Sequence, residues 1–214
     1  VCFYREDLTM AFIVEYLALS LLLLHITVTS SFSLSELVGK TLLAPSTEST
    51  HHLKNSALLV IDIISPPSEN PYILAVNLNN PTAFTVGEMT GKFLGTILAS
   101  STLYRGGGSS PDQSVTTVHA FPKVPGSRRI TPSSSPSPSP SPHDESLYVG
   151  GDLAALEREA VEGKAAKVKF FFGHVELGEE EVENYDVAVN LPSELVLSDD
   201  PNIYSKSRRY ISAK

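Results

Sequence analysis

Apolar and polar positions alternate with short interruptions along most of the chain and predict a sequence of strands and helices. Residues 56–64 (SALLVIDII) form an apolar run that only Asp62 interrupts, which is typical of a central strand covered on both faces. Tyr72 to Leu78 gives a second such strand. Further strands are expected at 39–44, 116–121, 168–173 and 186–190.

Three segments carry helix signals. After a turn at Asn79-Asn80-Pro81, Thr85 and Glu88 have the spacing of a capping box, and Val86, Met89, Phe93 and Ile97 share a helical face, so Met89 and Phe93 are expected in the core. A second helix is predicted from Leu153 to Glu162, with Asp152 as its cap and Gly163 as its stop. Residues 178–184 have a helix-like acidic pattern, and residues 202–210 form a closing turn or helix.

The first part of the chain has a different pattern. Residues 1–9 precede Met10 and resemble upstream translation, and residues 11–28 are apolar and end at the small residues 29–31. This pattern favours a cleaved signal sequence over a retained membrane helix, although a basic n-region is missing. Phe32 after Ser31 resembles the junction of a bipartite plastid presequence; an ordinary secretory signal is the alternative. We therefore expect a plastid protein, or else a secreted one, with no membrane segment in its mature form.

Residues 132–145 include the run SSSPSPSPSP, which cannot build a core and is expected to be a disordered insertion. The chain has 214 residues, and without this insertion and the start of the chain the remainder suits one domain.

Composition limits the possible chemistry. A formal net charge of −8 disfavours binding to phosphate backbones, so a nucleic-acid partner is not expected. The basic residues are scattered, and both small groups, Arg128–Arg129 and residues 206–209, are interpreted as surface charge. The one cysteine, Cys2, lies outside the predicted domain, so the domain has no disulfide, Cys nucleophile or thiolate metal site. His51 and His52 are adjacent and lack a suitably spaced third ligand, so no metal site and no cofactor are predicted.

Two glycine-rich turns follow predicted strands and are the candidate site. The first, LYRGGG at 103–108, lacks the Lys-Ser/Thr ending of a phosphate loop, and LYVGGD at 147–152 repeats its pattern. Glycines that permit a positive φ in a tight turn are the simpler explanation. The alternative is a shared groove. His119 lies in an apolar strand, where a hydrogen-bonded core histidine is more common than a base. The candidate ligand-binding residues are Asn80, Arg105, Gly106, Gly107, His119, Gly150, Gly151 and His174.

Four collinear segments carry a family resemblance: YILAVNLNNPTAFTVGEM at 72–89, LYRGGG, VHAFPKVPGSRRI at 118–130 and LYVGGDLAALEREAVEGKA at 147–165. Together they resemble the AlgH/YqgE-like family across residues 37–210. The resemblance implies an α+β fold, with one compact domain in which a few helices flank a mixed, strongly curved or barrel-like sheet. Residues 168–173 (VKFFFG) resemble the family's R-F-F-x-G-Y segment, but the aromatic and Gly-Gln positions that follow it are lost here.

The resemblance implies no defined reaction. The historical name of the family, for control of alginate synthesis, implies a non-catalytic regulatory or binding protein whose partner is an unknown protein or small molecule. The alternative is an enzyme or small-ligand binder with a pocket near the diglycine turns, using Arg105, His119 or His174. The lack of a nucleophile motif, metal triad or phosphate loop favours the first hypothesis.

Overall fold

The computed structural model describes residues 33–48, 53–91, 96–108, 114–131, 146–161, 167–187 and 190–212. The chain divides into two units, Val1–Ser33 and Leu34–Lys214, and the fold described is that of the second unit. The predicted targeting segment, His51, His52, Phe93, Gly163 and the Pro/Ser insertion at 132–145 lie outside the described residues.

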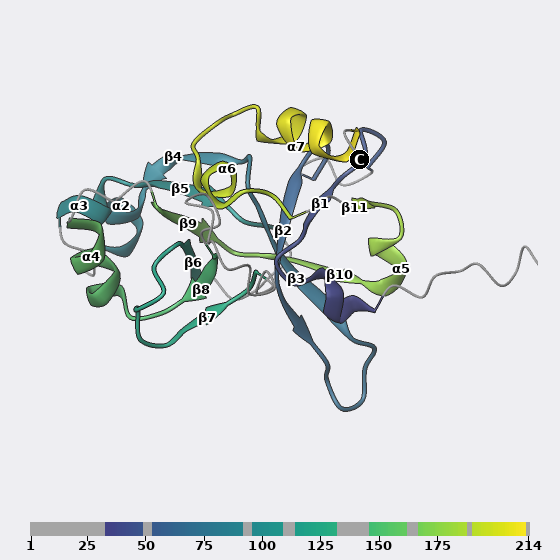
Figure 1. Ribbon diagram of the computed structural model, residues 1–214, viewed down its shortest axis with the longest axis horizontal. Helices are drawn as coiled ribbons and strands as arrows, with labels where there is room; N and C mark the ends of the chain where they lie inside the picture. The colour runs from purple at the N-terminus through teal and green to yellow at the C-terminus, as the bar shows by residue number, and fades with distance from the viewer. Residues whose placement is uncertain are drawn as a thin grey trace, which may run out of the picture. The chain divides into compact units, whose positions relative to one another are not determined.

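Five strands form an antiparallel sheet in the order β10-β3-β2-β1-β11 (Figure 1). Its central strand is β2 (Ala57–Ile64), which pairs with β3 (Tyr72–Asn77) through a register shift between Val60 and Asp62. The remaining strands of this first sheet are β1 (Thr41–Leu43), β10 (Val175–Gly178) and β11 (Asp186–Val187). The central position of the 56–64 run is confirmed.

Six strands form a second, mixed sheet in the order β4-β5-β9-β6-β8-β7. Its parallel pair joins β5 (Thr102–Arg105) to β9 (Val168–Phe172), and the other pairs are antiparallel. β7 and β8 form a hairpin across the segment that contains the Pro/Ser insertion. The other strands of the second sheet are β4 (Pro81–Thr85), β6 (Val115–His119), β7 (Ser127–Arg129) and β8 (Tyr148–Gly150).

Six α-helices in the described part of the chain flank the two sheets. Figure 1 shows α2, α3 and α4 gathered beside the second sheet, where Val86, Leu98 and Leu156 share a core cluster with Phe170 of β9. The helices are α2 (Val86–Thr90), α3 (Thr96–Ala99), α4 (Leu153–Val161), α5 (Glu179–Val182), α6 (Ser193–Leu197) and α7 (Ile203–Ser212), and a 3-10 turn, η1, spans Leu34–Leu37.

Side-chain alternation divides the core into layers. Along β2, Leu58 and Val60 join one cluster, whereas Ala57, Leu59 and Ile61 join another that also holds Tyr104 and Phe171 of the second sheet. Along β9, Val168 and Phe170 pack with α2, α3 and α4, while Phe171 lies in the cluster shared by both sheets. Such alternation follows from the two-residue period of a strand. The predicted α+β class with a strongly curled sheet is confirmed, with the strands divided between two sheets.

The capping box at Thr85 and Glu88 is confirmed, because Thr85 accepts from the Glu88 backbone and the Glu88 carboxylate accepts from the Thr85 backbone. The helix that it starts is short, however, since Gly91 ends it with φ 71°. The prediction that Met89 is a core residue was wrong: Met89 is 45% exposed, because the helix stops before its apolar face is long enough to be covered.

Three elements differ from the predictions. Residues 81–85 form the edge strand β4 where a turn leading directly to a helix was expected. Residues 175–178 form β10, which was not predicted, and the helix-like stretch expected at 178–184 is the short helix α5. Helix α6 was not predicted, and it supplies one wall of the candidate site.

Candidate functional site

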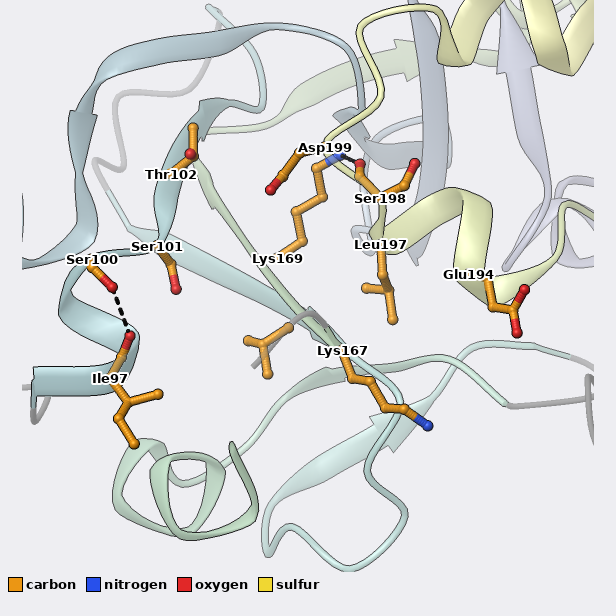
Figure 2. Close-up of a pocket in the computed structure, with 11 residues that line it drawn as sticks. Ile97, Ser100, Ser101, Thr102, Lys167, Lys169, Glu194, Leu197, Ser198 and Asp199 are labelled. Carbon is orange, nitrogen blue, oxygen red and sulfur yellow. Dashed lines mark hydrogen bonds between the residues drawn. The ribbon is translucent and has the colours of Figure 1, made fainter. Parts of the chain in front are cut away.

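A pocket of about 580 Å³ opens where α3, the start of β9 and the segment after α6 meet (Figure 2). Its apolar surface comes from Ile97, Val168 and Leu197. The remaining lining residues are polar: Ser100, Ser101, Thr102, Lys167, Lys169, Glu194, Ser198 and Asp199.

Lys169 is the central residue of this site. It lies in the apolar strand β9 and is only 2% exposed, on the side of the strand that faces Tyr104 and Phe171. Its Nζ donates to the carbonyl oxygen of Leu78 at 3.0 Å and to that of Ser198 at 2.8 Å. The ammonium therefore joins the end of β3 to the segment after α6.

The Tyr104 ring covers a further side of this ammonium, with its centroid 3.9 Å from Nζ. A cation over an aromatic face is attracted by the ring quadrupole, more strongly when it is desolvated. Burial lowers the pKa of Lys169 to about 8, and the negative charge of Asp199 opposes this shift. With two carbonyls and a ring around it, the ammonium has its hydrogen-bonding capacity largely satisfied within the protein.

Asp199 is held by the same tyrosine. The Tyr104 hydroxyl donates to Asp199 Oδ1 at 2.6 Å, the short distance expected of a bond to a charged acceptor. Burial, and then this hydrogen bond, raise the pKa of the Tyr104 hydroxyl. No other described residue hydrogen-bonds to Asp199, so its second carboxylate oxygen is available on the pocket side.

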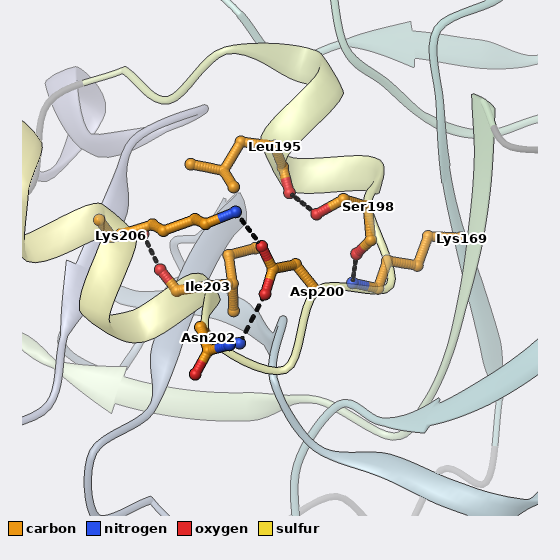
Figure 3. Close-up of polar contacts among 8 residues, drawn as sticks. Lys169, Leu195, Ser198, Asp200, Asn202, Ile203 and Lys206 are labelled. Atoms are coloured by element: carbon orange, nitrogen blue, oxygen red, sulfur yellow. Dashed lines mark hydrogen bonds and ion pairs between the residues drawn. The ribbon is translucent and has the colours of Figure 1, made fainter.

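The segment after α6 is held on both sides of Asp199, through hydrogen bonds of Ser198 and contacts of Asp200 (Figure 3). Ser198 Oγ donates to the Leu195 carbonyl at 2.8 Å. Asp200 forms an ion pair with Lys206 of α7 and accepts from the Asn202 backbone at 2.8 Å, and these contacts lower the pKa of Asp200. The wall that presents Asp199 is therefore preorganised.

Two hydroxyls complete the pocket. Ser101 and Thr102 follow α3 and lead into β5, and both side chains are partly exposed at the lining. Neither hydroxyl bonds to another residue that the structure describes, whereas Ser100 Oγ donates to the Ile97 carbonyl. Ser101 and Thr102 can therefore donate to or accept from a bound molecule.

None of the eight residues named from sequence lines this pocket. Arg105 is exposed at the end of β5, and Asn80 precedes β4, where its carbonyl accepts from the Arg105 backbone. His174 follows β9 and lies 3.1 Å from a Glu176 carboxylate oxygen through Nε2. These residues thus lie at one end of the β5–β9 pair, whereas the pocket lies at the start of β9.

His119 is a structural residue, as the more common reading of a histidine in an apolar strand predicts. Its Nδ1 accepts from the Phe121 backbone at 3.1 Å, so Nε2 carries the proton and donates to the Gly150 carbonyl at 3.0 Å. It is fully buried between Phe121 and Tyr148, and burial lowers its pKa. Both ring nitrogens are occupied, so the ring has no free position for acid–base work in this arrangement.

The two diglycine turns require glycine for different physical reasons. Gly150 and Gly151 have φ values of 75° and 105°, as the tight-turn explanation predicts. Gly106 and Gly107 have no positive φ, so that explanation was wrong for them. A Cβ at Gly107 would lie 2.0 Å from the His174 carbonyl oxygen, and one at Gly106 would lie 2.2 Å from that of Gly173. The first turn therefore requires glycine because its backbone contacts the backbone of Gly173 and His174, which leaves no room for a Cβ.

The turns also contact different segments: Gly151 lies against Val124 and Ser127, and Gly107 against His174. Both follow strands of the second sheet, β5 and β8, which β9 and β6 separate.

The sequence contains one signal for this site. Lys169 is the one charge within the apolar run of β9, VKFFF, and a charge inside a buried strand needs a partner. Its partners come from residues 78, 104 and 198, which no spacing pattern links to position 169.

Within the described ranges, no cluster of three or more His, Cys, Asp or Glu side chains has the geometry to bind a metal ion. None of the helices in those ranges has both the length and the apolar character that crossing a membrane requires.

Comparison with known proteins identifies the fold. No protein-family model matches the chain, and no curated protein matches it. Two solved structures are similar. Protein DIP2367 from Corynebacterium diphtheriae is 21% identical, with a TM-score of 0.56 over 80% of this chain and 85% of that one. AlgH from Pseudomonas aeruginosa is 10% identical, with a TM-score of 0.57 over 87% of this chain and 93% of that one. The chain therefore has an AlgH-like fold.

Proposed function

We propose that this chain is a non-catalytic binding protein of the AlgH/YqgE-like family and that it binds a small molecule in the pocket between α3, β9 and α6. The observation that carries the proposal is the pocket itself, about 580 Å³ in volume, with two unpartnered hydroxyls and one available carboxylate oxygen. This volume is within the range of small-molecule sites. The similar structures support the family, and the pocket supports the binding role.

The side chains that could act as acids, bases or nucleophiles are already bonded within the protein, which favours a binding role over catalysis. Lys169 donates to two carbonyls and is covered by Tyr104, the Tyr104 hydroxyl is bonded to Asp199, and both nitrogens of His119 have backbone partners. A catalytic base or nucleophile needs a free position directed at the substrate. The polar groups that are free are the Ser101 and Thr102 hydroxyls and the second oxygen of Asp199, and neither hydroxyl hydrogen-bonds to a base among the residues described.

The test is native mass spectrometry of the purified full chain beside two matched variants. Ser101→Phe fills the pocket, and Ser205→Phe makes the same change on an exposed residue of α7. We expect a non-covalent small molecule on the wild type and on Ser205→Phe, and none on Ser101→Phe. A molecule that stays bound to folded Ser101→Phe would contradict the proposal.

The cellular location is a separate proposal that rests on sequence alone. The apolar run at 11–28 and the Ser31-Phe32 junction support delivery to a plastid, with secretion as the alternative. N-terminal sequencing of the native protein tests the cleavage that both routes require: a start at Phe32 supports removal of the apolar run, and retention of that run contradicts both routes.

A further inference from the structure

The charges around the pocket balance. Lys167 and Lys169 contribute two positive charges, and Glu194 and Asp199 contribute two negative charges. Lys167 and Glu194 each have a partner of their own. An uncharged ligand keeps this balance, whereas a ligand with a net charge would leave the pocket with an unbalanced charge.

Among the described residues that line the pocket, no cation is free to meet an anionic ligand. Lys169 is buried, its Nζ donates to the carbonyls of Leu78 and Ser198, and the Tyr104 ring covers another side. To bind a carboxylate, this ammonium would have to give up one of the two carbonyls, which would then be left without a hydrogen-bond donor.

A cationic ligand meets the opposite difficulty. Asp199 has one available oxygen, but its charge already acts on Lys169, whose pKa it raises against the effect of burial. Asp199 is exposed, and a cation bound at its carboxylate would oppose the favourable effect of that carboxylate on the Lys169 ammonium, because like charges repel. The carboxylate can instead accept a hydrogen bond from a neutral O–H or N–H without adding charge.

We propose that the pocket selects uncharged small molecules that have an apolar body and a hydrogen-bond donor, with Asp199 as the acceptor that Tyr104 orients. This inference rests on the proposed function. Ile97, Val168 and Leu197 would contact the apolar body, and the Ser101 and Thr102 hydroxyls would hydrogen-bond to a second polar group. Alcohols and primary amides have this chemistry.

The experiment is saturation-transfer NMR with the full chain and a fragment library. The library contains equal numbers of alcohols or primary amides, primary amines and carboxylates, with benzyl alcohol, benzylamine and benzoate as one matched set. Pocket binders are the fragments that bind wild type and Ser205→Phe but not Ser101→Phe. We expect alcohols and amides to dominate this group and to bind Asp199→Asn about tenfold more weakly.

Each other outcome has a distinct meaning. If no fragment loses its binding in Ser101→Phe, the proposed function itself fails. If amines or carboxylates dominate the pocket binders, the pocket stands and the inference about ligand class is overturned. If alcohols dominate but Asp199→Asn binds them as tightly as the wild type, the assigned role of Asp199 is overturned. Should Asp199→Asn not fold, Thr102→Val serves instead, with a loss of affinity expected and an unchanged affinity contradicting the assigned contacts.

Discussion

The Tyr104 hydroxyl donates to Asp199 Oδ1 at 2.6 Å, across 95 positions of sequence, and so ties the second sheet to the segment that follows α6. Both residues also act on Lys169, through the ring of one and the charge of the other. The three side chains form one polar cluster, two members of which line the pocket, so a change to any of them is expected to affect both stability and binding.

Tyr104→Phe keeps the ring over Lys169 and removes only the hydrogen bond to Asp199. Since a bond to a charged group contributes about 1.5–3 kcal/mol, we expect the free energy of unfolding to fall by about 1–2 kcal/mol. Urea denaturation measures this change. Tyr210→Phe, at an exposed tyrosine of α7, is the matched control and should have no comparable effect. An equal stability for Tyr104→Phe and wild type would show that the bond is absent in solution.

Lys169→Met removes the ammonium and leaves the carbonyls of Leu78 and Ser198 without their donor. The substitution removes the cost of burying a charge, but it leaves two carbonyls without a donor, which costs more. We therefore expect the free energy of unfolding to fall by about 1–3 kcal/mol. Lys54→Met, at an exposed lysine, is the control and should change stability by less than about 0.5 kcal/mol. Guanidinium denaturation compares the two, and equal stabilities would contradict the role assigned to Lys169.

Stability should depend on pH through Lys169. Its pKa is about 8 in the folded protein, against 10.5 for an ordinary lysine. Between these values the unfolded chain binds more protons than the folded one, so raising the pH favours folding. From pH 8 to 9.5 the unfolding free energy of wild type should rise by about 1.5 kcal/mol relative to Lys169→Met. At higher pH, the raised pKa values of Tyr104 and Tyr185 make the unfolding free energy fall as the pH rises, so the comparison stops at pH 9.5. If the unfolding free energies of wild type and Lys169→Met changed equally with pH, the contribution assigned to Lys169 would be refuted.

The first diglycine turn should tolerate no side chain. A Cβ at Gly107 would overlap the His174 carbonyl, whereas one at Gly91 would meet nothing within 4 Å despite its φ of 71°. We expect Gly107→Ala to lower the unfolding free energy by more than about 3 kcal/mol, and Gly91→Ala by only about 1–2 kcal/mol, the strain of a left-handed alanine. Thermal unfolding ranks the two variants. The reverse order would mean that Gly107 serves a purpose other than backbone packing.

The central part of the fold could be predicted because its signals are local. The runs that form β2, β3 and β9 are apolar and bounded by turns, and Thr85 with Glu88 specifies a helix start within four residues. Strand β4 was missed because it is mostly exposed and pairs with β5 through an irregular register, so its sequence shows no alternation. Helix α6 is only five residues long, too short to show a helical period.

The candidate site could not be predicted for a different reason. Lys169, Tyr104 and Asp199 lie on three segments that only the tertiary fold brings together. The repeated glycine pattern favours a site at the two turns, but the Gly106-Gly107 turn is explained by contact between two backbones. A buried charge within an apolar strand was the stronger signal for a polar cluster, because such a charge needs partners wherever they lie in the sequence.

The most direct test of the binding role is the mass of the native, non-denatured protein, compared between wild type and Ser101→Phe. The account predicts that wild type has a small molecule bound that dissociates on denaturation, and that Ser101→Phe has the mass of the bare chain. A folded Ser101→Phe that binds the same molecule in the same proportion would place the ligand elsewhere and contradict the account.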